Sequence, residues 1–104
     1  MKISEIVSSA VEAEVLQERM GALDRTSKRL GRLISELKNL GHELDRLDRT
    51  RYVPGLADRI QRSVAIEMDL AIAAYHHLRA AAMDALRLLM VQRECCGFRD
   101  HEVI

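Results

Sequence analysis

The stretch Leu30–Leu47, LGRLISELKNLGHELDRL, decides the fold because its leucines keep a strict spacing along the chain. Three of them recur every seven residues, and each is followed by another leucine three residues later. The leucines of this pattern are Leu30, Leu33, Leu37, Leu40, Leu44 and Leu47. An alternation of three and four residues places one narrow apolar stripe along an α-helix, as in a coiled coil or a long bundle helix. The stretch therefore predicts a long helix that packs lengthwise against a partner.

The leucine pattern continues towards the N-terminus but weakens there. Leu16 and Leu23 keep the seven-residue rhythm, whereas Arg19 and Thr26 occupy the alternate positions. Gly21 lies in the same region, and a glycine in a helix interior costs about 1 kcal/mol relative to alanine. We therefore expect one helix over about residues 4–50, with Gly21 as the candidate position for a kink.

The sequence TRYVPGL at residues 50–56 predicts the end of this helix. Pro54 cannot donate a backbone hydrogen bond and restricts Val53, while Gly55 permits a turn. We expect a loop at about 51–55, a second helix at about 56–96 and a tail at 97–104. The whole chain of 104 residues then forms a single all-α helical-hairpin domain.

The second helix is predicted to be apolar around much of its circumference. One stripe again alternates four and three residues and contains Val64, Met68, Ala71, Tyr75, Leu78, Ala82, Ala85 and Leu89. A second stripe beside it contains Ile66, Leu70, Ala73, Ala74 and Ala81. A hairpin gives this helix only one partner, and the remaining apolar side chains would form a larger exposed patch than monomers usually carry.

This surplus of apolar surface predicts that the hairpin self-associates. Two copies that pack their second helices together would form an antiparallel four-helix bundle or coiled coil, so a homodimer is favoured. The residues predicted to carry this assembly are Leu30, Leu33, Leu37, Leu40, Leu44, Met68, Ala71, Tyr75, Leu78 and Ala82. The substitution Ala71→Glu or Leu78→Glu is expected to break the oligomer.

The composition restricts the class of protein. Sixteen basic residues balance sixteen acidic ones, and neither a secretory signal nor an uncharged span of about 20 apolar residues is present. These features predict a cytoplasmic protein without a membrane segment. The sequence also lacks phosphate-binding loops, nucleophile elbows and metalloprotease motifs. The expected function is that of a non-enzymatic structural, adaptor or regulatory module, with a possible protein partner and without a cofactor.

A basic cluster supports an alternative function. Arg25, Lys28, Arg29 and Arg32 lie within two helical turns and would suit contact with nucleic-acid phosphates. No aromatic residue stands near them for base stacking. A solvated helix flank is therefore the favoured interpretation, and a nucleic-acid-binding regulator is the alternative.

The C-terminal stretch RECCGFRDHEVI offers a second alternative, a metal- or redox-responsive bundle. Cys95, Cys96 and His101 are the candidate ligands or reactive groups. Adjacent cysteines diverge on a helix, whereas zinc usually takes thiolates at least two residues apart. The favoured interpretation is a helix end, with Gly97 in a left-handed conformation and Phe98 packing back on the last turn.

Overall fold

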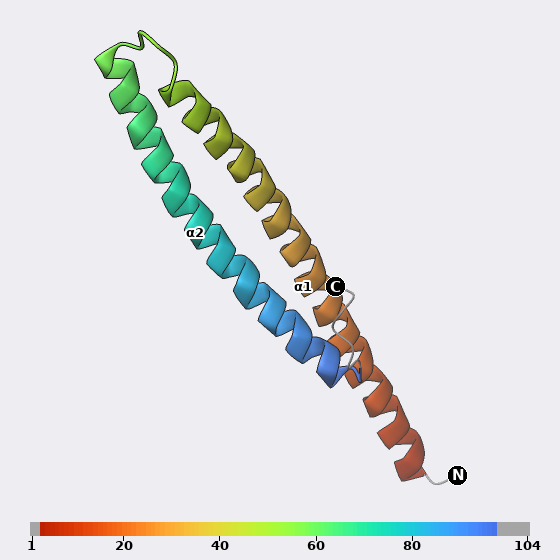
Figure 1. Cartoon of the computed structure of the whole chain (residues 1–104). Coiled ribbons are helices and arrows are strands. Elements are labelled where there is room, and N and C mark those ends of the chain that lie inside the picture. Colours follow the sequence, from red (N-terminus) through yellow and green to blue (C-terminus); the bar gives the residue numbers. More distant parts are fainter. Residues whose placement is uncertain (1–2, 98–104) are drawn as a thin grey trace. The chain divides into compact units, whose positions relative to one another are not determined.

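The computed structural model describes residues 3–97, and these form two helices joined by a short loop (Figure 1). Helix α1 covers Ile3–Arg51 and helix α2 covers Asp58–Cys95. The two helices pack against each other as a hairpin, and the described residues contain no strand. The predicted all-α helical hairpin is therefore confirmed.

The apolar stripes predicted from the sequence form the seam between α1 and α2. Leu30 and Leu47 are buried, and the other four leucines of the heptad pattern are half-buried. On α2 the first stripe is likewise covered: Val64, Ala82, Ala85 and Leu89 are buried, and Met68, Ala71, Tyr75 and Leu78 are half-buried. The narrow apolar face of each helix, as its sequence pattern predicts, is thus covered by the other helix.

The chain divides into two compact units, each of which contains part of both helices. The first unit combines the residues up to Leu30 with those from Asp84 onwards, and the second comprises Gly31–Met83. Buried residues of the first unit are Thr26, Leu30, Ala85 and Leu89, and those of the second are Leu47, Val64 and Ala82. Two of these buried residues, Ala82 and Ala85, are alanines, whose small side chains favour close packing of helices.

Thr26 shows how the hairpin tolerates a polar residue in the seam. Its side chain is 8% exposed, and its hydroxyl donates a hydrogen bond of 3.0 Å to the carbonyl of Ala22 in the preceding turn. Because this partner lies in the same helix, the hydroxyl is satisfied without any polar group on α2. The seam therefore continues past the position at which the leucine pattern weakens.

The conformation of the loop is explained by its proline and glycine. Backbone bonds from Tyr52 to Arg49 and from Val53 to Thr50 close the last turn of α1. Gly55 then adopts φ +76°, a left-handed conformation that glycine reaches without strain. Proline followed by glycine at positive φ is typical of a type II turn.

The second helix begins later than the sequence suggested, at Asp58 rather than at about residue 56. The carbonyl of Ala57 accepts the first helical bond, from the amide of Gln61 at 3.0 Å. Ala57 therefore occupies the N-cap position, and the loop covers residues 52–57. The turn at Pro54 and Gly55 needs these extra residues before the chain can enter helical geometry.

The predicted end of α2 is confirmed at Gly97, which has φ +88°. Its amide donates to the carbonyl of Glu94 at 3.0 Å, and the amide of Cys96 donates to that of Gln92 at 3.1 Å. This is the pattern of a helix closed by a left-handed glycine. The expected packing of Phe98 lies outside the described residues.

Gly21 does not interrupt α1, which is helical on both sides of it and through it. The penalty of one glycine, about 1 kcal/mol, is too small to end a helix with good residues on either side. A kink at Gly21 stays a prediction. Neither α1 nor α2 is long and apolar enough to cross a membrane.

Candidate functional site

The second apolar stripe of α2 is exposed in the second unit. Ile66 is 61% exposed and Leu70 is 67% exposed, and Ala73 and Ala74 beside them are also exposed. These residues share one flank of the helix, because positions three and four apart lie on the same face. We call this group the α2 flank. It is the part of the predicted apolar surface that the chain's own α1 leaves uncovered.

The residues predicted to carry the oligomer lie mainly in the seam of a single chain. Leu30 and Ala82 are buried, and the others are half-buried: Leu33, Leu37, Leu40, Leu44, Met68, Ala71, Tyr75 and Leu78. The hairpin thus already covers much of each side chain. Their contact with a second copy stays a prediction, and the more exposed candidates for that contact are those of the α2 flank.

Sequence reasoning missed the first part of α1. Every residue from Ile3 to Met20 is exposed, and Ile3 is 80% exposed. We call residues 3–18 the N-terminal extension. In Figure 1 this segment continues past the end of α2, where Arg19 donates a hydrogen bond of 3.2 Å to the carbonyl of Cys95.

The extension has an apolar stripe of its own, on a different face from the leucine seam. The heptad positions of the seam are polar here, with Glu5, Ser9 and Glu12. The apolar residues are instead Ile3, Ile6, Val7, Ala10 and Val11, which recur at helical spacing. This spacing is visible in the sequence and could have predicted a separate apolar face on the extension. Helix α2 ends at Cys95, at the level of Arg19, so α2 does not cover this segment.

A shallow groove lies beside Tyr75 in the second unit. It is lined by Leu37, Gly41 and His42 together with Tyr75, whose ring meets that of His76 edge-on with centroids 6.3 Å apart. Nothing lies within 4 Å of the position that a side chain on Gly41 would take. Lys38 and Asp45 also line the groove and are exposed, so the groove is an open, solvated surface rather than an enclosed ligand cavity.

The basic cluster is solvent-exposed and partly neutralised. Lys28 pairs with Asp24 at 3.0 Å, and the guanidinium of Arg25 lies against Gly21 in the preceding turn. Arg29 and Arg32 are also exposed, the latter in the second unit. No base-stacking aromatic residue lies in this stretch of α1. Binding of nucleic acid by these residues stays a prediction, and a steep salt dependence of affinity would be its signature.

The structure describes two of the three candidate metal or redox residues. Cys95 is exposed at the end of α2, Cys96 is half-buried in the turn after it, and both are free thiols. His101 lies outside the described residues. Within residues 3–97, no group of three or more histidine, cysteine or carboxylate side chains is arranged to hold a metal ion.

One ion pair perturbs the titration of its members. Arg46 donates to Glu43 through two nitrogens, one of them at 2.9 Å, and this hydrogen bonding lowers the pKa of the Glu43 carboxyl below its usual value. The same contact raises the pKa of Arg46, to which the charge of Glu67 on α2 adds. Both side chains are exposed to solvent, so we expect the pair to contribute little to stability.

Comparison of the chain with protein families, with curated proteins and with solved structures gives no match. The arrangement of its own residues is therefore the basis for a functional conclusion. That arrangement consists of a covered seam, an exposed apolar flank on α2 and an exposed amphipathic extension of α1.

Proposed function

We propose that this chain is a non-enzymatic interaction module that works as a homodimer of helical hairpins in the cytoplasm, in a structural, adaptor or regulatory role. The observation that carries the proposal is the α2 flank, on which Ile66 and Leu70 are each more than half exposed. Aliphatic side chains grouped in this way are typical of a surface that another protein covers.

The chemistry of the α2 flank suits a second helix better than a small ligand. Ala73 and Ala74 lie next to Leu70, and such small side chains allow a neighbouring helix to approach closely. The flank has large side chains at one end, Ile66 and Leu70, and small ones at the other, Ala73 and Ala74. When two copies lie antiparallel, the large side chains of one flank therefore face the small side chains of the other. A two-fold arrangement in which α2 meets α2 closes the assembly at a dimer.

Sedimentation equilibrium of the purified chain tests the proposal. We expect a dimer for the native sequence and a monomer for Leu70→Glu or Ala74→Glu, because either change would place a charge against the partner helix. Ala71→Glu and Leu78→Glu are less informative variants, because both residues are half-buried in the seam. Their substitution would also disturb the hairpin, so a loss of the dimer could not be assigned to the contact between copies.

Ala65→Glu is the matched control for Ala74→Glu. Both alanines are exposed on α2, but they lie nine residues apart and therefore on opposite sides of the helix. The control variant is expected to remain a dimer with unchanged helical content by circular dichroism. A native chain that sediments as a monomer up to about 100 µM, far above the submicromolar dissociation constants of stable complexes, would refute the proposal.

A further inference from the structure

Within the first unit, helix α1 carries a charged face on the side opposite the seam. Glu14 lies nine residues before the seam residue Leu23 and therefore on the other side of the helix, because each residue turns an α-helix by about 100°. The residues that follow Glu14 on this side recur every three or four positions. We call this group the α1 charged face, and it consists of Glu14, Glu18, Gly21, Ala22, Arg25 and Arg29.

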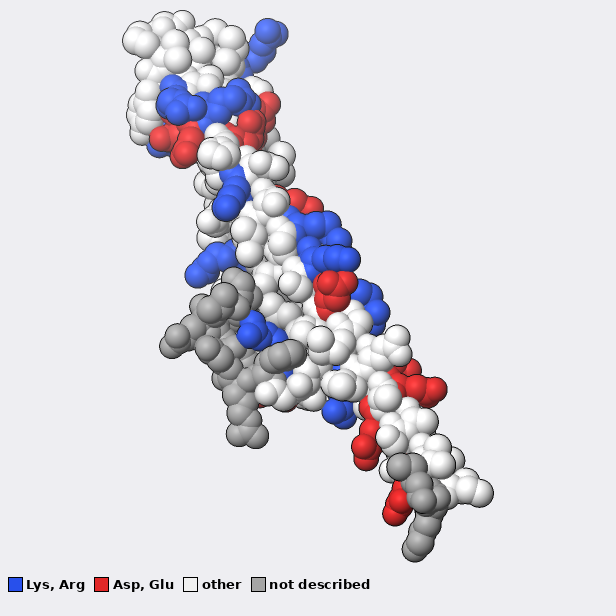
Figure 2. Space-filling model, turned by 90° about the vertical axis from the view of Figure 1, so that its right-hand side faces the viewer, with Lys and Arg blue, Asp and Glu red and all other residues white. Residues whose placement is uncertain are grey.

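The two signs of charge are separated along the α1 charged face. Its N-terminal half is acidic, with Glu14 and Glu18, and its C-terminal half is basic, with Arg25 and Arg29. Figure 2 shows carboxylates near the N-terminal end of α1 and lysine and arginine side chains farther from that end. The face therefore has two halves of equal and opposite charge.

The four charged side chains of this face lack partners within the part of the chain that the structure describes. All four are exposed, and none of them forms an ion pair within residues 3–97. Glu14 and Glu18 are four residues apart, as are Arg25 and Arg29, and like charges at this spacing repel each other. Opposite charges brought by another molecule would relieve both repulsions.

A groove lies between the acidic and the basic half. The residues that line it include Glu18, Gly21, Ala22 and Arg25, all of them on α1. A guanidinium nitrogen of Arg25 lies 3.4 Å from the position that a Cβ on Gly21 would take, so the glycine is covered by a flexible side chain that can move aside. Small residues such as Gly21 and Ala22 let the backbone of a second helix approach closely.

We propose that the α1 charged faces of two copies pack antiparallel about a two-fold axis near Gly21 and Ala22. In this arrangement the acidic half of each helix lies against the basic half of the other, so all the charges of the face meet charges of opposite sign. Parallel packing would place like charges together. A nucleic acid is a poorer occupant of this face, because the glutamates beside the arginines would repel its phosphates.

This contact is separate from the dimer proposed above, which uses the α2 flank. Exposed charge pairs each contribute little and are screened by salt. At about 150 mM salt we therefore expect the native chain to remain a dimer. At about 10 mM salt, where screening is weak, we expect the α1 charged faces to join these dimers into larger assemblies.

The first test isolates the contact in the Leu70→Glu chain, in which the α2 flank is blocked. Sedimentation equilibrium at about 10 mM salt is expected to show a monomer–dimer equilibrium, with a dissociation constant that rises at least about tenfold by about 150 mM salt. A Leu70→Glu chain that stays monomeric at low salt up to about 1 mM, where even weak complexes form, overturns the inference alone. A native chain that is monomeric at about 150 mM salt overturns the α2 contact instead.

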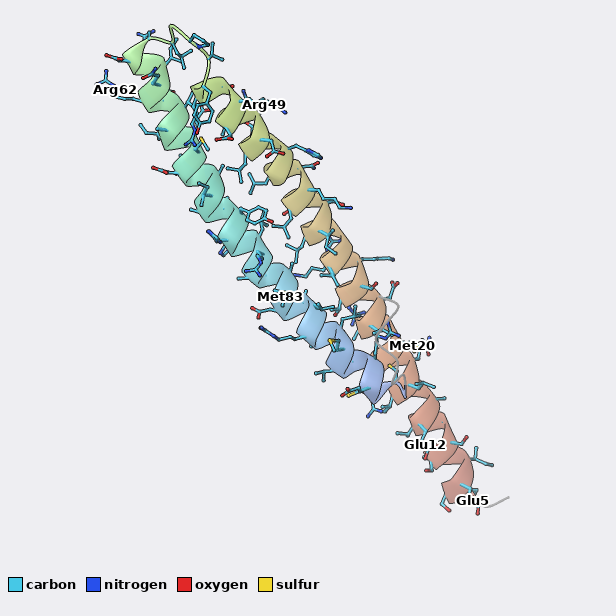
Figure 3. The ribbon with its side chains drawn as sticks, viewed as in Figure 1. Glu5, Glu12, Met20, Arg49, Arg62 and Met83 are labelled. Carbon is cyan, nitrogen blue, oxygen red and sulfur yellow. The ribbon has the colours of Figure 1, made fainter. Side chains whose placement is uncertain are left out.

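The second test reverses one charge in the Leu70→Glu background. Glu14→Arg is expected to raise the dissociation constant at low salt at least about tenfold, because attraction to the partner's arginines becomes repulsion. Glu12→Arg is the matched control, since Glu12 (Figure 3) lies two residues away and about 160° around the helix. It is expected to change the constant by less than about threefold. Equal effects at the two positions would mean that net charge alone controls association, and would overturn the inference.

The third test exchanges charges between copies in the same background. Glu14→Arg/Glu18→Arg makes the face entirely basic, and Arg25→Glu/Arg29→Glu makes it entirely acidic. Each variant alone is expected to be monomeric at low salt, whereas an equimolar mixture is expected to form a heterodimer. Circular dichroism confirms that both variants keep the helical content of the parent chain. A mixture that remains monomeric would contradict the pairing of these two faces.

Discussion

At the scale of single residues, the glycines of the hairpin have opposite roles. Gly31 and Gly41 lie within α1, and a Cβ at either position would meet nothing within 4 Å. Because alanine is favoured over glycine in a helix interior, we expect Gly31→Ala and Gly41→Ala each to raise the free energy of unfolding by about 1 kcal/mol. Urea denaturation at fixed protein concentration measures this change.

Gly97 provides the contrasting control. Its φ of +88° lies where an alanine is strained, so Gly97→Ala is expected to lower the free energy of unfolding by about 1 kcal/mol. A stabilising effect at Gly97, or a destabilising one at Gly31, would contradict the packing described for these positions. If only Gly41→Ala weakened the dimer, that glycine would lie at the contact between copies.

The Glu43–Arg46 pair makes stability depend on pH in a definite direction. The pKa of Glu43 is lower in the folded chain than its ordinary value of 4.5. Its contribution is therefore present above that value and is lost as the pH falls through the lower, folded value. We expect Glu43→Gln to have a lower Tm than the native chain at pH 7 and the same Tm in strong acid.

Thermal unfolding monitored by circular dichroism between pH 7 and pH 2 tests this prediction. Arg46→Gln removes the other member of the pair and should show the same pH profile as Glu43→Gln. A difference between Glu43→Gln and the native chain that persisted at pH 2 would show that another property of the glutamate matters.

At the scale of the elements, helix α2 has a weak beginning. Ala57 is its N-cap, and alanine offers no side-chain oxygen to the free amides of the first turn. We expect Ala57→Asp or Ala57→Asn to raise the free energy of unfolding by about 1 kcal/mol. Ala57→Val, which adds bulk without an acceptor, should give no gain in the same denaturation experiment.

Most of the elements could be predicted from the sequence. The heptad of Leu30–Leu47 and the stripe through Val64 and Leu89 both face the seam, as their periodicity indicated. Prediction was less accurate at the start of α2, because the number of residues needed to leave the turn at Gly55 depends on backbone angles that the sequence does not specify. It also missed the extension, whose apolar stripe changes face before Leu16.

At the scale of the whole molecule, dimer formation should couple stability to protein concentration. A complex that unfolds with dissociation becomes more stable as the concentration of its subunits rises. We expect the Tm of the native chain to increase over a hundredfold range of concentration, and that of Leu70→Glu to stay constant. A native Tm independent of concentration, together with a monomeric mass, would contradict the dimer.

The sequence by itself determined which segments are helical, where the chain turns and which faces of each helix are apolar, because these properties follow from local periodicity and from Pro54 and Gly55. Tertiary structure decided which of those apolar faces is covered within one chain. Whether an apolar face is covered by the other helix depends on the length of the loop and on where α2 ends along α1. The periodicity of the sequence carries no information on either. The seam is thus closed inside the hairpin, while the α2 flank and the N-terminal extension remain open to another molecule.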